Sequence, residues 1–302
     1  MHINKKIYHL ILMLICPLLS YSQQLPHFTQ YMFNTISINP AYAGSREKLN
    51  VSFLNRNQWV GITGAPVTQT FAMHSGVTNT QLGIGLSIIN DKLGYENTFY
   101  AFSDLSYSIN VIDDYWLSFG LKAGFSKYGL DPALLMENDS YLDAIFNKLK
   151  PNFGAGIYLR SDKFFVGLSS PKIISHTNNT DIVYTAIERA SYYLMGGYLL
   201  EFSPSLVFKP TAVIKYTKGA PTSVDITGNF LIKDNLWLGA AYRFGDAFGA
   251  YVSILAAEDL RIGYSYEFIT SDLNPYTSGS HEIFISYEFQ LLRPSCNCAS
   301  KF

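Results

Sequence analysis

The chain has 302 residues, of which 48% are hydrophobic and 15% are charged, and its net charge at pH 7 is −1. A net charge this close to zero does not indicate binding to nucleic acid or to acidic substrates, both of which favour a strongly basic protein. Only three cysteines occur, too few for the disulfide framework of a small secreted scaffold.

The first 22 residues are predicted to form a secretory signal peptide. Two lysines precede an apolar run over residues 7–19, and a small-x-small cleavage site follows at 20–22. The run is too short to cross a bilayer as a helix. Cys16 could mark a lipoprotein, but the apolar run continues past it, which favours a leader removed by cleavage.

The rest of the chain alternates between apolar and polar residues. It contains no run of about 20 apolar residues, so only strands could carry it across a membrane. In the segment 260–268, for example, Ile262 and Tyr264 alternate with Gly263 and Ser265. A period of two residues places the first set in lipid and the second in the lumen of a barrel.

Fourteen such segments are predicted to be strands. They cover residues 48–59, 66–76, 80–90, 95–110, 115–128, 151–160, 163–171, 189–202, 205–217, 222–233, 235–245, 247–256, 259–270 and 280–290. Tight turns alternate with longer links, as periplasmic turns and outer loops do in barrels that have both termini in the periplasm. Only the link near Asp246 is short on the side of the longer links. A soluble β-sandwich has no reason to sort its loops this way. The predicted fold class is all-β: a transmembrane antiparallel β-barrel of about 14 strands with an N-terminal plug, in the outer membrane of a Gram-negative cell.

Residues 23–47 do not alternate, and they are the predicted plug. Fourteen strands enclose a lumen too wide for wall side chains alone to fill. Pro40 and Gly44 bracket a turn that aromatic residues precede. The expected plug residues are Phe28, Tyr31, Asn39, Pro40, Tyr42 and Gly44. The predicted organisation is a signal peptide at 1–22, a plug at 23–47, a barrel at 48–291 and a periplasmic tail at 292–302.

Six charged residues are expected to face the lumen, because a charge on the lipid side of the bilayer midplane costs about 2–4 kcal/mol. They are Lys122, Arg243, Arg261, Glu267, Glu282 and Glu288. Arg243, Arg261 and Glu267 fall on neighbouring or nearby strands, so we expect them to pair with each other or with the plug. The alternative is an ion-selective lining.

A long outer link over residues 129–150 carries an apolar pattern. Asp131 followed by Pro132 is typical of a helix start, and the residues after it predict a short amphipathic helix. This loop either covers the barrel as a lid or provides a docking surface for another protein. The docking residues would be Leu135, Leu142, Ile145 and Phe146.

No part of the sequence has the spacing of a catalytic or metal site. His74 and Ser75 are consecutive strand residues that point to opposite faces, and no Gly-x-Ser-x-Gly elbow occurs. The histidines, cysteines and carboxylates lack metal-ligand spacing. Cys296 and Cys298 lie in the tail, where an exposed thiol or an interchain link is the simplest interpretation. We therefore predict no enzyme, no metal and no cofactor.

The amino-terminal motifs resemble those of a known family. Residues 30–32 (Gln-Tyr-Met), 39–44 (Asn-Pro-Ala-Tyr-Ala-Gly) and 56–59 (Arg-Asn-Gln-Trp) precede a barrel-like remainder. Together they are similar to the PorP/SprF family of outer-membrane proteins associated with the type IX secretion system. The resemblance covers essentially the whole chain after the leader.

The resemblance implies a non-enzymatic barrel that helps to secrete a cargo protein or to anchor it at the cell surface. The cargo, often an adhesin, would be bound through its type IX C-terminal signal. Partners among the periplasmic ring and peptidoglycan-binding lipoproteins are also implied, as are contact with outer-membrane lipid and gliding motility in some species. The turn at 39–41 is also similar to that of fatty-acid-transporter (FadL-like) barrels. A channel for hydrophobic small molecules is therefore the alternative.

Overall fold

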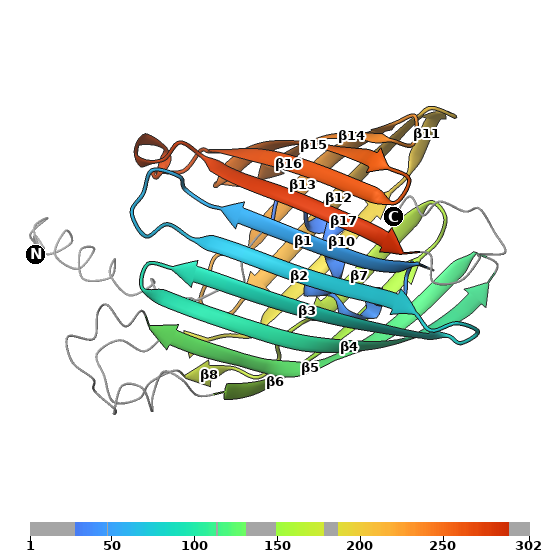
Figure 1. Ribbon diagram of the computed structural model, residues 1–302, viewed down its shortest axis with the longest axis horizontal. Helices are drawn as coiled ribbons and strands as arrows, with labels where there is room; N and C mark the ends of the chain where they lie inside the picture. The colour runs from blue at the N-terminus through green and yellow to red at the C-terminus, as the bar shows by residue number, and fades with distance from the viewer. Residues whose placement is uncertain (1–27, 47, 113, 131–148, 178–186, 290–302) are drawn as a thin grey trace, which may run out of the picture.

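The structure, a computed structural model, describes residues 28–46, 48–112, 114–130, 149–177 and 187–289. Its sheet contains 15 strands, of which β10 and β11 both pair with β12 and form one interrupted strand, so the barrel has 14 (Figure 1). β1 pairs with β17 as well as with β2, which closes the sheet. The predicted barrel of fourteen antiparallel strands is confirmed.

The strands follow one another around the barrel in chain order. They are β1 (Leu49–Asn57), β2 (Val67–Gly76), β3 (Leu82–Leu93), β4 (Glu96–Ile112), β5 (Tyr115–Leu130), β6 (Leu149–Arg160), β7 (Phe164–Ser170), β10 (Ser191–Tyr198), β11 (Leu200–Ser203), β12 (Leu206–Thr217), β13 (Ser223–Ile232), β14 (Leu236–Arg243), β15 (Ala247–Ala257), β16 (Leu260–Ile269) and β17 (Ser280–Phe289). A separate pair, β8 (His176–Thr177) and β9 (Ile187–Glu188), lies in the link after β7, and η4 (Asn274–Tyr276) lies in the link before β17. Every predicted strand boundary falls within three residues of an observed one.

The two faces of the wall differ as the alternation predicts. Ile262 and Tyr264 are exposed on the outer face, whereas Ser265 and Glu267 of the same strand are buried. Closing the sheet leaves no unpaired backbone edge in the hydrocarbon region, where each unpaired group would cost several kcal/mol. No helix in the described ranges is long and apolar enough to cross a bilayer.

Residues 28–46 lie inside the barrel (Figure 1) and are called the inner segment below. It consists of η1 (Tyr31–Phe33), α2 (Thr35–Ile38) and η2 (Pro40–Tyr42). The Asn39 side chain accepts a hydrogen bond from the Ala41 amide at 3.0 Å and caps η2, and Pro40 occupies the first helical turn. These short helical turns pack their side chains against the surrounding wall.

The inner segment runs along the barrel from one end to the other. Phe28 lies beside Arg243 and Ala247, which flank the link between β14 and β15. This link is at the end of the barrel where the longer links lie. Gly44 lies against Gly76 and Gly83, at the side of the short turns. β1 begins and β17 ends at the short-turn side, as predicted for the periplasm, but Phe28 lies at the opposite end. The inner segment is therefore oriented with Phe28 at the long-link end and Gly44 at the short-turn end.

Candidate functional site

A buried charge network holds the upstream end of the inner segment, and we call it the Glu282 clamp. The Glu282 carboxylate accepts hydrogen bonds from the amides of Thr29 at 3.0 Å and Gln30 at 2.8 Å. Arg56 of β1 donates to Glu282 at 3.1 Å and also pairs with Glu267. The Thr29 hydroxyl donates to Glu267 at 2.6 Å. Three strands and the inner segment thus share one set of paired charges.

Arg243 extends this network toward the long-link end. Its guanidinium pairs with Asp225 at 2.7 Å and with Glu267 at 3.5 Å. Arg261, which we expected to join Arg243 and Glu267, instead follows the short turn between β15 and β16. It is half-buried there, and its Nη1 atom has no hydrogen-bond partner among the described residues. One strand carries Arg261 and Glu267 at opposite ends, so the two cannot meet.

A second buried ion pair holds the middle of the inner segment. Lys122 and Asp104 lie on adjacent strands, 2.9 Å apart, and both are buried. The Lys122 ammonium also donates to the carbonyl of Ile36 at 3.3 Å and to Ser87 at 2.9 Å. The ion pair and the two hydrogen bonds offset the desolvation penalty of the buried ammonium.

Salt bridges also fix the downstream end of the inner segment, at the short-turn side. Arg46 pairs with Glu288 of β17, and both side chains are partly exposed. Lys48 donates to Asp259 at 2.8 Å, a hydrogen bond that raises the pKa of Lys48. Exposed pairs of this kind contribute at most about 1 kcal/mol each. Removing one partner of the buried upstream clamp should therefore cost more than removing one partner here.

Small wall residues receive the middle of the inner segment. A Cβ atom on Gly120 would clash with the backbone of Ala41, and one on Gly156 would clash with the side chain of Asn39. Ser106 donates to the carbonyl of Ala43 at 2.6 Å. Inward glycines in strands often mark such a close approach of two backbones.

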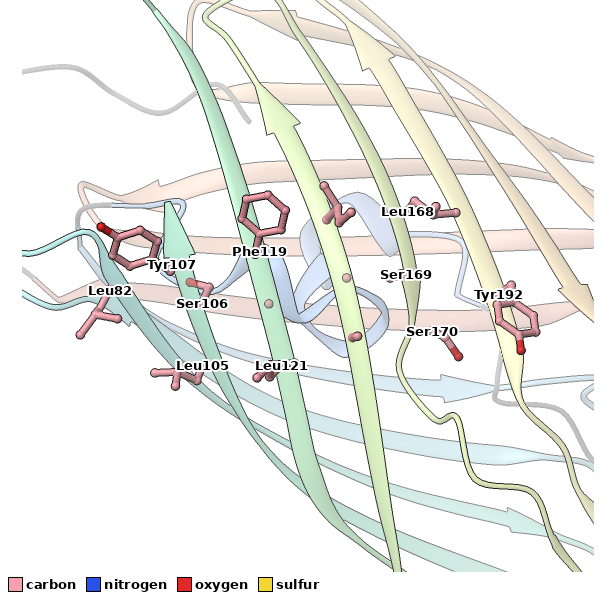
Figure 2. A pocket seen from close by; sticks show the side chains of 14 residues that line it. Leu82, Leu105, Ser106, Tyr107, Phe119, Leu121, Leu168, Ser169, Ser170 and Tyr192 are labelled. Atoms are coloured by element: carbon pink, nitrogen blue, oxygen red, sulfur yellow. The ribbon is translucent and has the colours of Figure 1, made fainter. Parts of the chain in front are cut away.

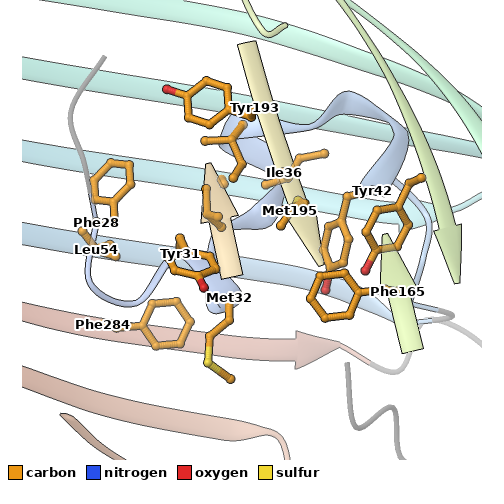
Figure 3. Close-up of a cluster of buried hydrophobic side chains, with 14 of the residues drawn as sticks. Phe28, Tyr31, Met32, Ile36, Tyr42, Leu54, Phe165, Tyr193, Met195 and Phe284 are labelled. Atoms are coloured by element: carbon orange, nitrogen blue, oxygen red, sulfur yellow. The ribbon is translucent and has the colours of Figure 1, made fainter. Parts of the chain in front are cut away.

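The predicted plug residues are brought together in the lumen. Phe28, Tyr31, Asn39, Pro40 and Tyr42 are buried, and Gly44 has a φ of 70°, which favours glycine. Figure 3 shows their aromatic rings beside wall residues that include Phe165, Tyr193 and Phe284. The hydroxyls of Tyr31 and Thr211 lie 2.6 Å apart.

The family comparison matches most of the chain. Residues 20–287 match the model of the type IX secretion system membrane protein PorP/SprF. The chain belongs to the PorP/SprF family. A closed barrel with lipid-facing apolar residues, in a membrane protein of this system, places this PorP/SprF protein in the outer membrane.

Solved structures share the barrel fold at low sequence identity. The CymD monoaromatic hydrocarbon channel has 12% identity over 88% of this chain and 94% of its own, with a TM-score of 0.51. A TodX deltaS2S3 mutant monoaromatic hydrocarbon channel has 10% identity over 83% and 92%, with a TM-score of 0.50. Omp33 of Acinetobacter baumannii has 9% identity over 80% and 98%, with a TM-score of 0.47. The likenesses to CymD and to the TodX mutant establish the fold alone. No curated protein sequence matches the PorP/SprF chain significantly.

Sequence reasoning missed several charged residues in the lumen of this PorP/SprF barrel, among them Arg56, Asp104, Asp225 and Arg46. Arg56, Asp104 and Asp225 fall on the inner set of predicted strands, so the two-residue period could have found them. Arg46 lies outside the strands, where the period gives no information.

Several predicted residues lie outside the described ranges. These are Leu135, Leu142, Ile145 and Phe146 of the outer link, and the tail cysteines Cys296 and Cys298. Within the described part of the chain, no three His, Cys, Asp or Glu side chains are grouped so that they could hold a metal ion.

Proposed function

We propose that this PorP/SprF protein is a non-enzymatic barrel that holds a secreted type IX cargo protein at the cell surface. The cargo would dock at the long-link end through its C-terminal domain. The short-turn end would face periplasmic ring or peptidoglycan-binding components of the machinery. Family membership supports the connection to type IX secretion.

The observation that carries the proposal is the occupied lumen. The inner segment is buried against the wall along its length, and the Glu282 clamp and the Arg46–Glu288 pair hold its two ends. The cavity beside Phe28 and Arg243 has a volume of only about 10 Å³. With the lumen occupied in this way, the inner segment would act as a plug and the cargo would be held outside the lumen.

Docking is assigned to the outer link over residues 131–148 on its sequence pattern. The double variant Leu142→Ser and Phe146→Ser removes two large apolar side chains and should lower cargo co-purification from gently extracted outer membranes at least fivefold. The control Asn138→Ser with Asn147→Ser alters two polar residues of the same link and should leave capture unchanged. Equal capture by both double variants, with both barrels folded, would refute docking at this link.

The plug is tested by single-channel conductance. Deleting residues 24–44 should convert a closed barrel into a pore with steady conductance in planar bilayers. A full-length protein that already conducts, or that takes up hydrophobic small molecules into vesicles, would favour the FadL-like channel. An unchanged conductance after deletion would count against the plug.

A further inference from the structure

The outer face of the barrel carries a hollow of about 610 Å³, which we call the trough. It crosses the wall from β3 through β4, β5, β6 and β7 to β10 (Figure 2). Leu105, Phe119, Leu121, Ile157 and Leu168 line its sides, and Tyr192 closes its far end. These side chains belong to the lipid-facing set, so the trough opens into the membrane.

The trough exists because two outward positions in one cross-strand row are small. Leu121 pairs with Ala155, and Ala155 pairs with Ser170. The neighbouring row places Phe119 and Ile157 at the corresponding outward positions. The missing side-chain volume leaves a gap in the apolar layer, and the gap reaches the wall backbone.

The wall beneath the trough is one backbone thick. Gly120 and Gly156 line the trough, and the inner segment presses on their other side. Ser169 also lines it and donates a hydrogen bond inward to the carbonyl of Ile38 at 2.7 Å. Whatever fills the trough therefore lies across a single strand layer from the turn at 39–41.

At its β3 end the trough continues into a polar hollow. Asn79, Thr80 and Gln81 line this second hollow, which shares Leu82 and Tyr107 with the trough. The Tyr107 hydroxyl donates to the Gln81 side chain at 2.6 Å. These residues form the short turn between β2 and β3, which faces the periplasm. No charged residue occurs among the described residues that line either hollow.

The dimensions fit one lipid chain in one leaflet. Six strands spaced about 4.8 Å apart give a trough about 24 Å long. The strands of such barrels are tilted by about 40° from the barrel axis. A trough that runs perpendicular to the strands therefore rises by about 15 Å along this axis over its length. This equals half of a hydrocarbon core about 30 Å thick. The polar end lies at the headgroup level of the periplasmic leaflet.

We propose that the trough and its polar end form a binding site for a single phospholipid of the periplasmic leaflet. One acyl chain lies over Ala155 and Ser170, and the headgroup contacts Asn79 and Gln81. The headgroup is neutral or zwitterionic, because an anionic lipid would find no cation there. The site lies on the wall away from the cargo-docking end, so it does not depend on the cargo proposal.

The test uses the full chain in nanodiscs of phosphatidylethanolamine and phosphatidylglycerol. A trace of phosphatidylethanolamine carries a photoactivatable diazirine on its acyl chain, and adducts are mapped by peptide mass spectrometry. We expect at least fivefold more adduct on β5 and β6 peptides than on β13 to β15 peptides. Ala155→Leu fills the gap and should lower the β5 and β6 adducts at least fivefold. Ala250→Leu changes an exposed, outward alanine on the far side of the barrel and should not.

Several results would overturn the proposal. Adducts spread evenly around the wall, or unchanged by Ala155→Leu in a folded barrel, would show ordinary annular lipid. Stronger competition by unlabelled phosphatidylglycerol than by phosphatidylethanolamine would overturn the headgroup assignment. Benzoylphenylalanine at Leu121, introduced in the native outer membrane, avoids any folding defect of the filled variant. A lipid-sized adduct there supports the site, whereas a protein-sized adduct would assign the trough to a membrane-protein partner.

Discussion

Replacing Glu282 by glutamine should release the upstream end of the inner segment. The carboxylate is fully buried and accepts from two backbone amides and from Arg56. Removing one partner of a buried ion pair costs about 3–5 kcal/mol. Arg56 keeps Glu267 as a partner, so we expect the lower end of this range. An amide that is left without an acceptor adds about 1 kcal/mol or more.

The matched control is Glu288→Gln on the same strand. Glu288 also pairs with an arginine of the inner segment, but its side chain is 28% exposed, so the change should cost about 1 kcal/mol or less. Urea unfolding in lipid vesicles, followed by tryptophan fluorescence, gives the free energy of unfolding of each variant. Planar-bilayer recordings should show transient channel openings only for Glu282→Gln. If the two variants differ by less than about 1 kcal/mol and neither opens, Glu282 is no clamp.

Two further variants test the middle of the inner segment. Gly120→Ala should destabilise the barrel by about 1–3 kcal/mol because the added methyl group would clash with the Ala41 backbone. The control is Gly129→Ala on the same strand, where the methyl group would meet only the Asn97 carbonyl at 3.7 Å. Equal melting temperatures of the two variants would contradict the close approach. Lys122→Met should lower the free energy of unfolding by about 3–5 kcal/mol, because it leaves the Asp104 carboxylate unpaired. Adding Asp104→Asn should recover part of that loss. Strictly additive losses in the double variant would contradict the pairing.

The barrel was predictable because its signal is local. A two-residue period and alternating link lengths predicted every strand of the barrel wall, but not the short pair β8 and β9. The same period placed Glu267 and Glu282 in the lumen. The partners of those carboxylates were less accessible to sequence reasoning. Thr29 meets Glu267 across more than 200 residues of chain, and no periodic pattern specifies such a contact.

The strand register explains why Arg243 pairs with Glu267 whereas Arg261 does not. Both fall on inner positions, and sequence alone gives the face of each residue but not its height along the barrel. The pairing of β14, β15 and β16 brings Arg243 level with the upper part of β16, where Glu267 lies. The trough could not be predicted from the sequence either, because it depends on the alignment of Ala155 with Ser170 across two neighbouring strands.

The seam between β1 and β17 limits how the inner segment could leave the lumen. Phe28 lies at the long-link end, Gly44 lies at the short-turn end, and the seam between β1 and β17 closes the ring around the chain between them. Once the seam is complete, this stretch can leave only lengthwise. Sideways release of residues 28–46 would need the β1–β17 pairing to open, so the seam adds a topological constraint to the two anchors that hold the ends of the inner segment.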